Sequence, residues 1–152
     1  MNRSALTASL LILSFIGLAD AWYLTDTAFT GASLSCSITG LDGCNIVAQS
    51  PYSHLFGLPL ALYGVIFYGV LFALAALISV WPLRPGYRAL RILGILGILA
   101  SILFLLIQFV FIKALCVYCL LSGIVSLFAW LVTAQLWKYH LPPKLVSLPP
   151  HS

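Results

Sequence analysis

Four long apolar stretches, almost free of charged side chains, follow one another along the chain. They cover about residues 4–23, 55–81, 92–112 and 114–137. A helix needs about 20 apolar residues to cross the hydrocarbon core of a bilayer, and each stretch reaches that length. The pattern therefore predicts an all-α integral membrane protein, built as a four-helix transmembrane bundle.

The third and fourth stretches nearly merge, with a single charged residue, Lys113, between them. One helix over both would reach about 69 Å at 1.5 Å per residue, far more than a bilayer core of about 30 Å. We expect the chain to turn back at Lys113, because a lysine at the bilayer centre costs about 2.5–3.5 kcal/mol. The membrane domain is expected to cover residues 1–141, with an outer loop at 25–54 and a proline-rich cytoplasmic tail at 142–152.

The composition agrees with a membrane protein and excludes two other classes. The chain has 152 residues, of which 62% are hydrophobic and 7% charged, and its mean hydropathy is +1.13. A soluble domain carries about 25% charged residues, and a disordered chain lacks this aliphatic and aromatic content. The excess of seven Lys/Arg over three Asp/Glu is interpreted as a signal for membrane orientation and not for nucleic acid.

Six of the seven positive residues fall on one side of a four-span chain, whereas Asp20, Asp26, Asp42 and Lys113 fall on the other. The six are Arg3, Arg84, Arg88, Arg91, Lys138 and Lys144. The positive-inside rule assigns the side of these six to the cytoplasm, so both termini are expected there and the cysteines on the outer side. An alternative is that the first stretch, with Ala19-Asp20-Ala21 at its end, is a cleaved signal peptide. The loop that follows faces outward in both cases.

The four cysteines form two pairs. Cys116 and Cys119 make a C-x-x-C motif at the start of the fourth span, where positions three apart share a helix face and the helix dipole favours a thiolate. Cys36 and Cys44 lie eight positions apart in the outer loop, where they can close a small disulfide. Four cysteines permit three pairings, and a relay needs at least two of them to interconvert. Two pairs on one side of a membrane favour thiol redox chemistry.

Other interpretations of these cysteines stay open. The C-x-x-C residues are small enough to be ordinary packing, and the loop pair alone is typical of a structural staple in a non-enzymatic four-span scaffold. A zinc site with four thiolates usually comes from two short C-x₂₋₄-C turns. The spacing of Cys36 and Cys44 fits that poorly, so no metal is expected.

Two further segments accompany the cysteine pairs: Cys44 to Ser50 (CNIVAQS), and Leu55 to Gly64 (LFGLPLALYG) at the opening of the second span. With the loop pair first and the C-x-x-C last, the chain resembles the bacterial branch of the vitamin K epoxide reductase family of membrane thiol oxidoreductases. The resemblance extends from the first span to Trp137. It implies a multi-pass protein of the bacterial inner membrane.

The resemblance also implies a role for each cysteine. Cys36 would form a mixed disulfide with a thioredoxin-like (DsbA-like) protein, and Cys44 would pass the electrons to Cys116. Cys119 would deliver them to a membrane quinone, either ubiquinone or menaquinone. Ser50 matches the family's loop hydroxyl and would hydrogen-bond a quinone oxygen. The implied activity is quinone-dependent oxidation of partner thiols, which supports disulfide-bond formation.

A quinone needs an apolar slot with a few polar contacts. The candidate walls beneath Cys119 are Phe56, Leu60, Tyr63, Phe109 and Phe111. Vertebrate members that reduce vitamin K epoxide carry Asn and Tyr where this chain has Ser53 and Gly123, so quinone-epoxide reduction is the alternative and a plain quinone the expected substrate. Because the chain stops at Ser152 without a fused thioredoxin-like domain, the partner is expected to be a separate protein.

Overall fold

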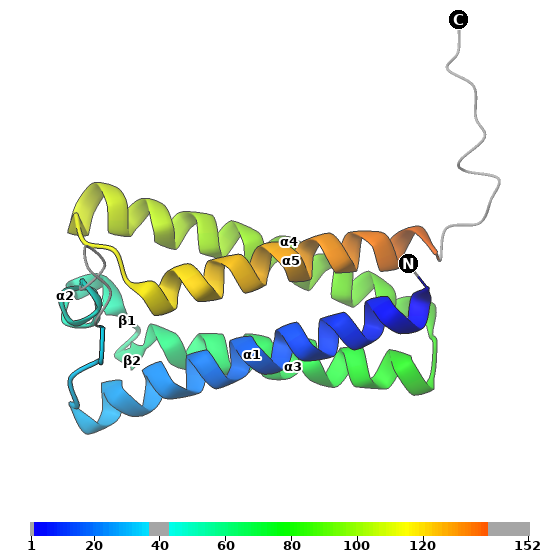
Figure 1. The fold of residues 1–152 in the computed structure, drawn as a ribbon, viewed down its shortest axis with the longest axis horizontal. Coiled ribbons are helices and arrows are strands. Elements are labelled where there is room, and N and C mark those ends of the chain that lie inside the picture. The colour runs from blue at the N-terminus through cyan, green and yellow to red at the C-terminus, as the bar shows by residue number, and fades with distance from the viewer. Residues whose placement is uncertain (1, 37–42, 140–152) are drawn as a thin grey trace, which may run out of the picture.

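Four long helices form a bundle (Figure 1). The computed structural model describes residues 2–36 and 43–139, so the predicted tail at 142–152 lies outside it, as do Asp42 and Lys144. The long helices are α1 (Arg3–Thr30), α3 (Leu60–Val80), α4 (Arg84–Ile107) and α5 (Val117–Lys138). In this part of the chain, four helices are long and apolar enough to cross a membrane, α4 being taken together with the turn η2 (Gln108–Ile112). The all-α transmembrane bundle predicted from the sequence is confirmed.

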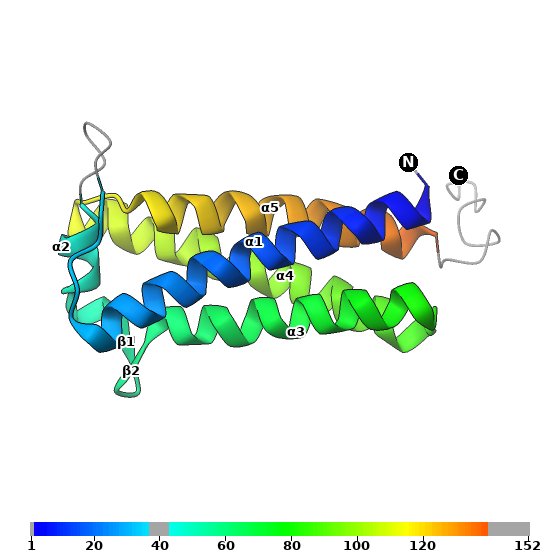
Figure 2. The ribbon, with the colours of Figure 1, turned by 60° about the horizontal axis from the view of Figure 1, so that its bottom comes forward.

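Short elements cover one end of the bundle. They are α2 (Cys44–Ala48), η1 (Pro51–Ser53), β1 (His54–Leu55) and β2 (Leu58–Pro59). The two strands pair antiparallel as a small hairpin, with Gly57 at a φ of 80° in its turn. Figure 2 shows these elements at the end of the bundle away from the start of α1. We call this end the cysteine end, because α2 begins at Cys44 and Cys116 directly precedes α5.

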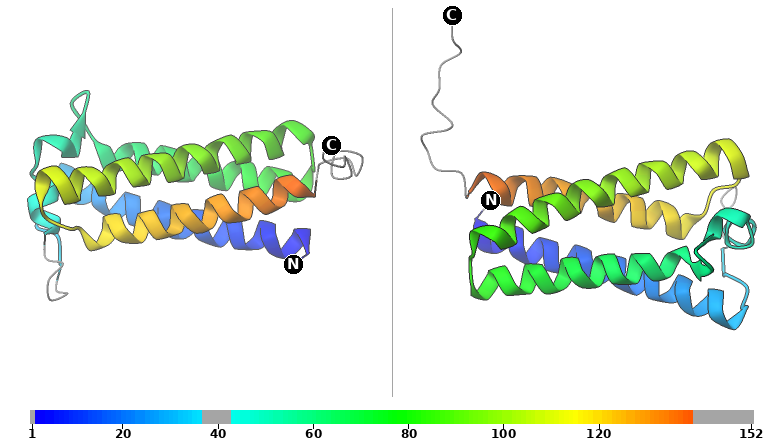
Figure 3. Two further views of the ribbon diagram at one scale, coloured as in Figure 1. Left: turned by 90° about the horizontal axis from the view of Figure 1, so that it is seen from above. Right: turned by 180° about the vertical axis from the view of Figure 1, so that it is seen from behind.

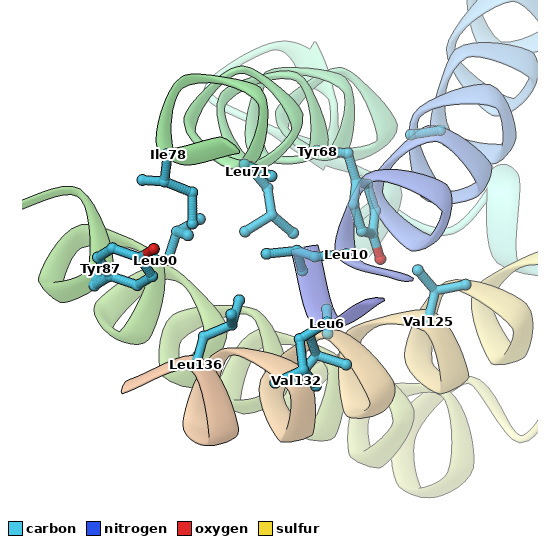
Figure 4. Close-up of a cluster of buried hydrophobic side chains, with 13 residues drawn as sticks. Leu6, Leu10, Tyr68, Leu71, Ile78, Tyr87, Leu90, Val125, Val132 and Leu136 are labelled. Carbon is cyan, nitrogen blue, oxygen red and sulfur yellow. The ribbon is translucent and has the colours of Figure 1, made fainter. Parts of the chain in front are cut away.

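The core follows the length of the bundle. Helix α1 packs against α3 and α5, and α4 packs against α5 (Figure 3). The labelled core side chains in Figure 4 come from all four long helices: Leu6, Leu10, Tyr68, Leu71, Ile78, Tyr87, Leu90, Val125, Val132 and Leu136. At Gly17 the Tyr68 ring lies where a Cβ would be, and membrane helices commonly use such small residues to approach closely. This packing fixes where the helix ends stand at the cysteine end.

The helix bounds differ from the predicted spans where apolar residues are not helical, or where the helix continues beyond the apolar stretch. Helix α1 continues to Thr30, into the predicted outer loop, and ends where Gly31 adopts a left-handed φ of 68°. Residues 55–59 are apolar but lie in or beside the hairpin, so α3 begins at Leu60. Helix α4 already begins at Arg84. The predicted turn at Lys113 is confirmed, since this residue ends η2 in a left-handed conformation.

Candidate active site

The loop cysteines Cys36 and Cys44 are joined by a disulfide, with 6.3 Å between their Cα atoms. Cys44 is fully buried as the first residue of α2, whereas Cys36 is partly exposed. The side chain of Asn45 connects α2 by hydrogen bonds to the segment before Cys36. Its Oδ1 accepts from the Leu34 N–H at 2.8 Å, and its Nδ2 donates to the Leu34 carbonyl oxygen at 3.2 Å. The pair is therefore held closed, with Cys36 as its more accessible member.

The cysteines of the C-x-x-C motif are free thiols at the start of α5. Cys116 caps this helix, because its Sγ accepts from the Cys119 N–H at 3.4 Å. Its own N–H donates to Oε1 of Gln108 at 3.1 Å. The Cys119 thiol, helped by the N–H groups of Cys119 and Tyr118, lowers the pKa of Cys116 to about 7, although burial opposes this shift. Cys116 can therefore react as a thiolate near neutral pH.

The two pairs belong to one cluster of packed side chains. Cys44 and Cys116 are buried in it, and Cys36 and Cys119 pack against them. In the described part of the chain, no group of three or more His, Cys, Asp or Glu side chains is arranged to hold a metal ion. The arrangement brings together two cysteine pairs that are far apart in the sequence, and thiol–disulfide exchange between adjacent pairs is the chemistry open to it.

Gly43 allows the close approach of the two segments that carry the pairs. A Cβ at this position would lie 2.8 Å from the Cβ of Ala114 and 2.9 Å from the carbonyl oxygen of Leu115. Both distances are shorter than a van der Waals contact allows, so only glycine lets the chain entering α2 lie against the segment entering α5.

A cavity of about 420 Å³ lies between the helices beside the cysteines. Cys44, Cys116 and Cys119 all line it, so both pairs border the same space. Its walls come from α1, α3, α4 and α5, together with the short elements at the cysteine end. Most of the lining is apolar, which suits a hydrophobic ligand that enters from a membrane.

The structure brings three of the predicted pocket residues to this cavity and leaves others away from it. Ser50, Leu60 and Tyr63 line the cavity. The hydroxyl of Ser50 donates to the Val47 carbonyl oxygen at 2.7 Å, and that of Tyr63 donates to the Leu55 carbonyl oxygen at 3.1 Å, so each hydroxyl keeps acceptor capacity.

The predicted wall residues Phe56, Phe109 and Phe111 do not line the cavity. Phe56 is 92% exposed in the hairpin turn, where its φ is 53°. Phe109 and Phe111 are exposed on η2, and the Phe111 ring contacts Tyr52 at 5.9 Å between centroids. Their side chains point away because the hairpin and η2 set their direction, which apolar character alone does not reveal.

Two polar residues at the cavity were missed by the sequence analysis. Gln108 is 1% exposed; its Oε1 accepts from the Cys116 N–H, and its side chain also interacts with the Cys119 thiol. Asp20 is 8% exposed and also lines the cavity. The available signal was a polar side chain within an apolar stretch, which in a membrane helix marks a functional position by default.

The long helices can span a membrane, and a disulfide-bonded loop pair packs on a free C-x-x-C pair. These two features define a class of membrane proteins that carry two adjacent cysteine pairs. Comparison with known families narrows this class. The model of the vitamin K epoxide reductase family matches residues 8–134, and the chain belongs to this family. Over 57 residues it is also 42% identical to "Thiol-disulfide oxidoreductase LTO1" from Arabidopsis thaliana. That match covers 38% of this chain and 15% of the plant protein.

Proposed function

We propose that the protein is a quinone-dependent thiol-disulfide oxidoreductase of the membrane. It oxidises a thioredoxin-like partner through Cys36 and Cys44 and passes the electrons through Cys116 and Cys119 to a quinone, which supports disulfide-bond formation. The observation that carries this proposal is the packing of both pairs in one cluster beside a cavity. The similarity of the chain to a plant protein named as a thiol-disulfide oxidoreductase supports the same class of activity.

Electrons enter at the loop disulfide. A thiolate of the partner attacks the Sγ of Cys36, which is the more exposed sulfur, and Cys44 leaves as a thiolate when the disulfide breaks. The second partner thiol then attacks the mixed disulfide. The partner leaves with a new disulfide, and Cys36 and Cys44 hold its two electrons as thiols.

Cys44 next passes the electrons to the inner pair, Cys116 and Cys119, which is joined by a disulfide at this stage. Its thiolate attacks the Sγ of Cys116, and Cys119 leaves. Cys36 then attacks Cys44, which closes the loop disulfide again and releases Cys116. The pKa of about 7 makes Cys116 a good leaving group. The product, with a closed loop disulfide and two free inner thiols, has the same cysteine state as the structure.

The cavity fits a quinone as the final acceptor. Its volume of about 420 Å³ lies within the usual range for ligand sites, about 300–1,000 Å³. The Gln108 side chain, which lies beside both inner cysteines, offers an Nε2 donor suited to a carbonyl oxygen. When bound, the quinone takes up two electrons and two protons and leaves as a quinol. The contribution of the protein is to hold it beside Cys119 while the Cys116–Cys119 disulfide forms.

The proposal includes a location in the bacterial inner membrane, with the cysteines outside and both termini in the cytoplasm. Arg3, Arg84 and Lys138 stand at helix ends away from the cysteine end (Figure 1), as the positive-inside rule requires for this orientation. The outer compartment of such cells permits disulfides, whereas the cytoplasm reduces them. Ubiquinone or menaquinone within that membrane would be the acceptor.

A single turnover with the purified, reduced protein tests the function. We expect added ubiquinone or menaquinone to be consumed as a Cys116–Cys119 disulfide forms, and Cys119→Ser to abolish both events. Mass mapping of the disulfides before and after the addition follows the sulfurs directly. A double variant that replaces Cys36 and Cys44 by serine is the matched control, because it should still oxidise its inner pair.

Three outcomes would change the assignment. If quinone leaves all four thiols reduced, the loop disulfide is only structural and the enzyme proposal fails. Stoichiometric binding of zinc to the four thiols would replace it by a metal site. Conversion of a quinone epoxide at a comparable rate would identify the alternative reductase activity.

A further inference from the structure

Asp20 is a buried carboxyl group that the reaction described above does not use. It lies in α1 with 8% of its surface exposed, and neither carboxylate oxygen has a hydrogen-bond partner in the described part of the chain. Burying an acid without a partner is costly, and ionisable side chains inside membrane helices commonly serve proton paths or substrate sites. The position of Asp20 therefore indicates a chemical role.

Asp20 lies between two hollows. On one side it lines the cavity that Cys116 and Cys119 also line. On the other it lines an open hollow over α1 and α5, together with Tyr23 and Tyr118, whose rings are 5.2 Å apart between centroids. A carboxyl group in this place can exchange a proton with a ligand in the cavity.

The groups that titrate around Asp20 come from its own helix, from α3 and from the start of α5. They are Tyr23, Tyr68, Cys116, Tyr118 and Cys119, which line the same two hollows as Asp20. The Tyr68 hydroxyl is engaged with two serines of α5 at 2.9 Å. Asp20 has no such competing bond, so it is the better placed of these two groups to transfer a proton.

The proton balance of the inner pair calls for such a group. Reduction of a quinone to a quinol takes two electrons and two protons. Near neutral pH the pKa of Cys116, about 7, leaves much of this thiol ionised, and the inner pair then carries one proton, on Cys119. The second proton must come from another acid at the cavity.

We infer that Asp20 supplies this second proton to a quinone in the cavity. The inference rests on the proposed function and adds a proton-relay residue to it. As the S–S bond of Cys116 and Cys119 forms, two electrons pass to the quinone. One proton comes from the Cys119 thiol and one from protonated Asp20, and the Asp20 carboxylate that remains takes up a proton from water before the next turnover.

Separate measurement of the two half-reactions tests the inference. The full chain in lipid vesicles is reduced, and its oxidation by ubiquinone at saturating concentration is followed by stopped flow. We expect Asp20→Asn to slow this step about 100-fold, the low end of what general acid catalysis supplies. Exchange between the loop disulfide and dithiothreitol should keep its rate, because Asp20 takes no part in it. Asp20→Glu should restore most of the rate of quinone reduction.

Asp26→Asn is the matched control, because it makes the same substitution at an exposed residue of the same helix, and it should leave both half-reactions unchanged. If the unmodified protein does not oxidise with quinone, the proposed function itself fails. If it does, and Asp20→Asn is equally fast, the inference is overturned. Equal slowing of both half-reactions without rescue by Asp20→Glu would also overturn it, since that pattern indicates a structural role.

Discussion

Cys116 is reactive because of groups within one turn of it. Its sulfur stands at the beginning of α5, where it accepts from the Cys119 N–H, and its N–H is held by Gln108. The N-terminal end of a helix favours a negative sulfur. The C-x-x-C spacing was enough to predict the helix start and the neighbouring thiol, because both are local to the motif, whereas the contact with Gln108 was not predicted.

The lowered pKa of Cys116 predicts a measurable pH dependence. With the loop disulfide closed, the thiolate absorbance of the inner pair should rise through about pH 7. The thiolate dominates above this pH and the thiol below it, so electron transfer should slow as the pH falls through 7. In Cys119→Ala the rise should move to higher pH, because the largest lowering contribution is lost. Ultraviolet titration from about pH 5 to about pH 8.5 checks this, and a rise unmoved by the substitution would contradict it.

Gln108 and Asp20 could not be recognised as site residues from the sequence alone. Both are polar residues in apolar stretches, which can be seen in the sequence. Whether they belong to the site depends on which way their side chains face. Gln108 faces inward because η2 is a π-helical turn, and such turns often occur at functional sites. No hydropathy pattern predicts that turn. The same limit explains Phe111, which is apolar like a pocket wall yet exposed.

At the scale of elements, hydropathy predicted the number of long helices but not where they begin and end. Residues 55–59 are as apolar as the span that follows, although they belong to the hairpin and not to α3. The glycine at position 57, with its φ of 80°, was the local sign of a turn. Helix α1 continues to Thr30 and ends where Gly31 adopts a left-handed conformation.

The contact between the segments entering α2 and α5 gives a second prediction. Gly43→Ala would place a methyl group against Ala114 and Leu115, so the two cysteine pairs should separate slightly and exchange between them should slow. Oxidation of the inner pair by quinone should keep its rate, and overpacking should cost about 1–3 kcal/mol of stability. Stopped-flow measurement of both steps, with thermal unfolding alongside, separates these effects.

Gly69→Ala is the control for this variant. Gly69 lies in α3, and no atom outside its own helix turn lies within 4 Å of the place that a Cβ would take, so its substitution should change neither step. Unaltered exchange in Gly43→Ala would show that the cysteine pairs do not depend on this contact.

At the scale of the whole molecule, the order of the cysteine pairs and the four apolar stretches were enough to predict the bundle and the family. The cavity could not be predicted, because it depends on helices that are distant in sequence and meet through contacts such as that of Gly17 with Tyr68. Such long-range packing has no periodic signature along the chain. The sequence therefore predicted the two cysteine pairs better than the walls of the cavity beside them.

The orientation in the membrane is the last prediction, and the redox proposal depends on it. Arg84 and Arg88 begin α4 at the end of the bundle away from the cysteines, and moving such charges across a bilayer is unfavourable. A reporter that is active only outside the cytoplasm should therefore be silent when fused at Gly86 and active when fused at Gly40. A cytoplasmic reading at Gly40 would place the cysteines in a reducing compartment, where a closed Cys36–Cys44 disulfide would not persist and the protein could not oxidise a partner.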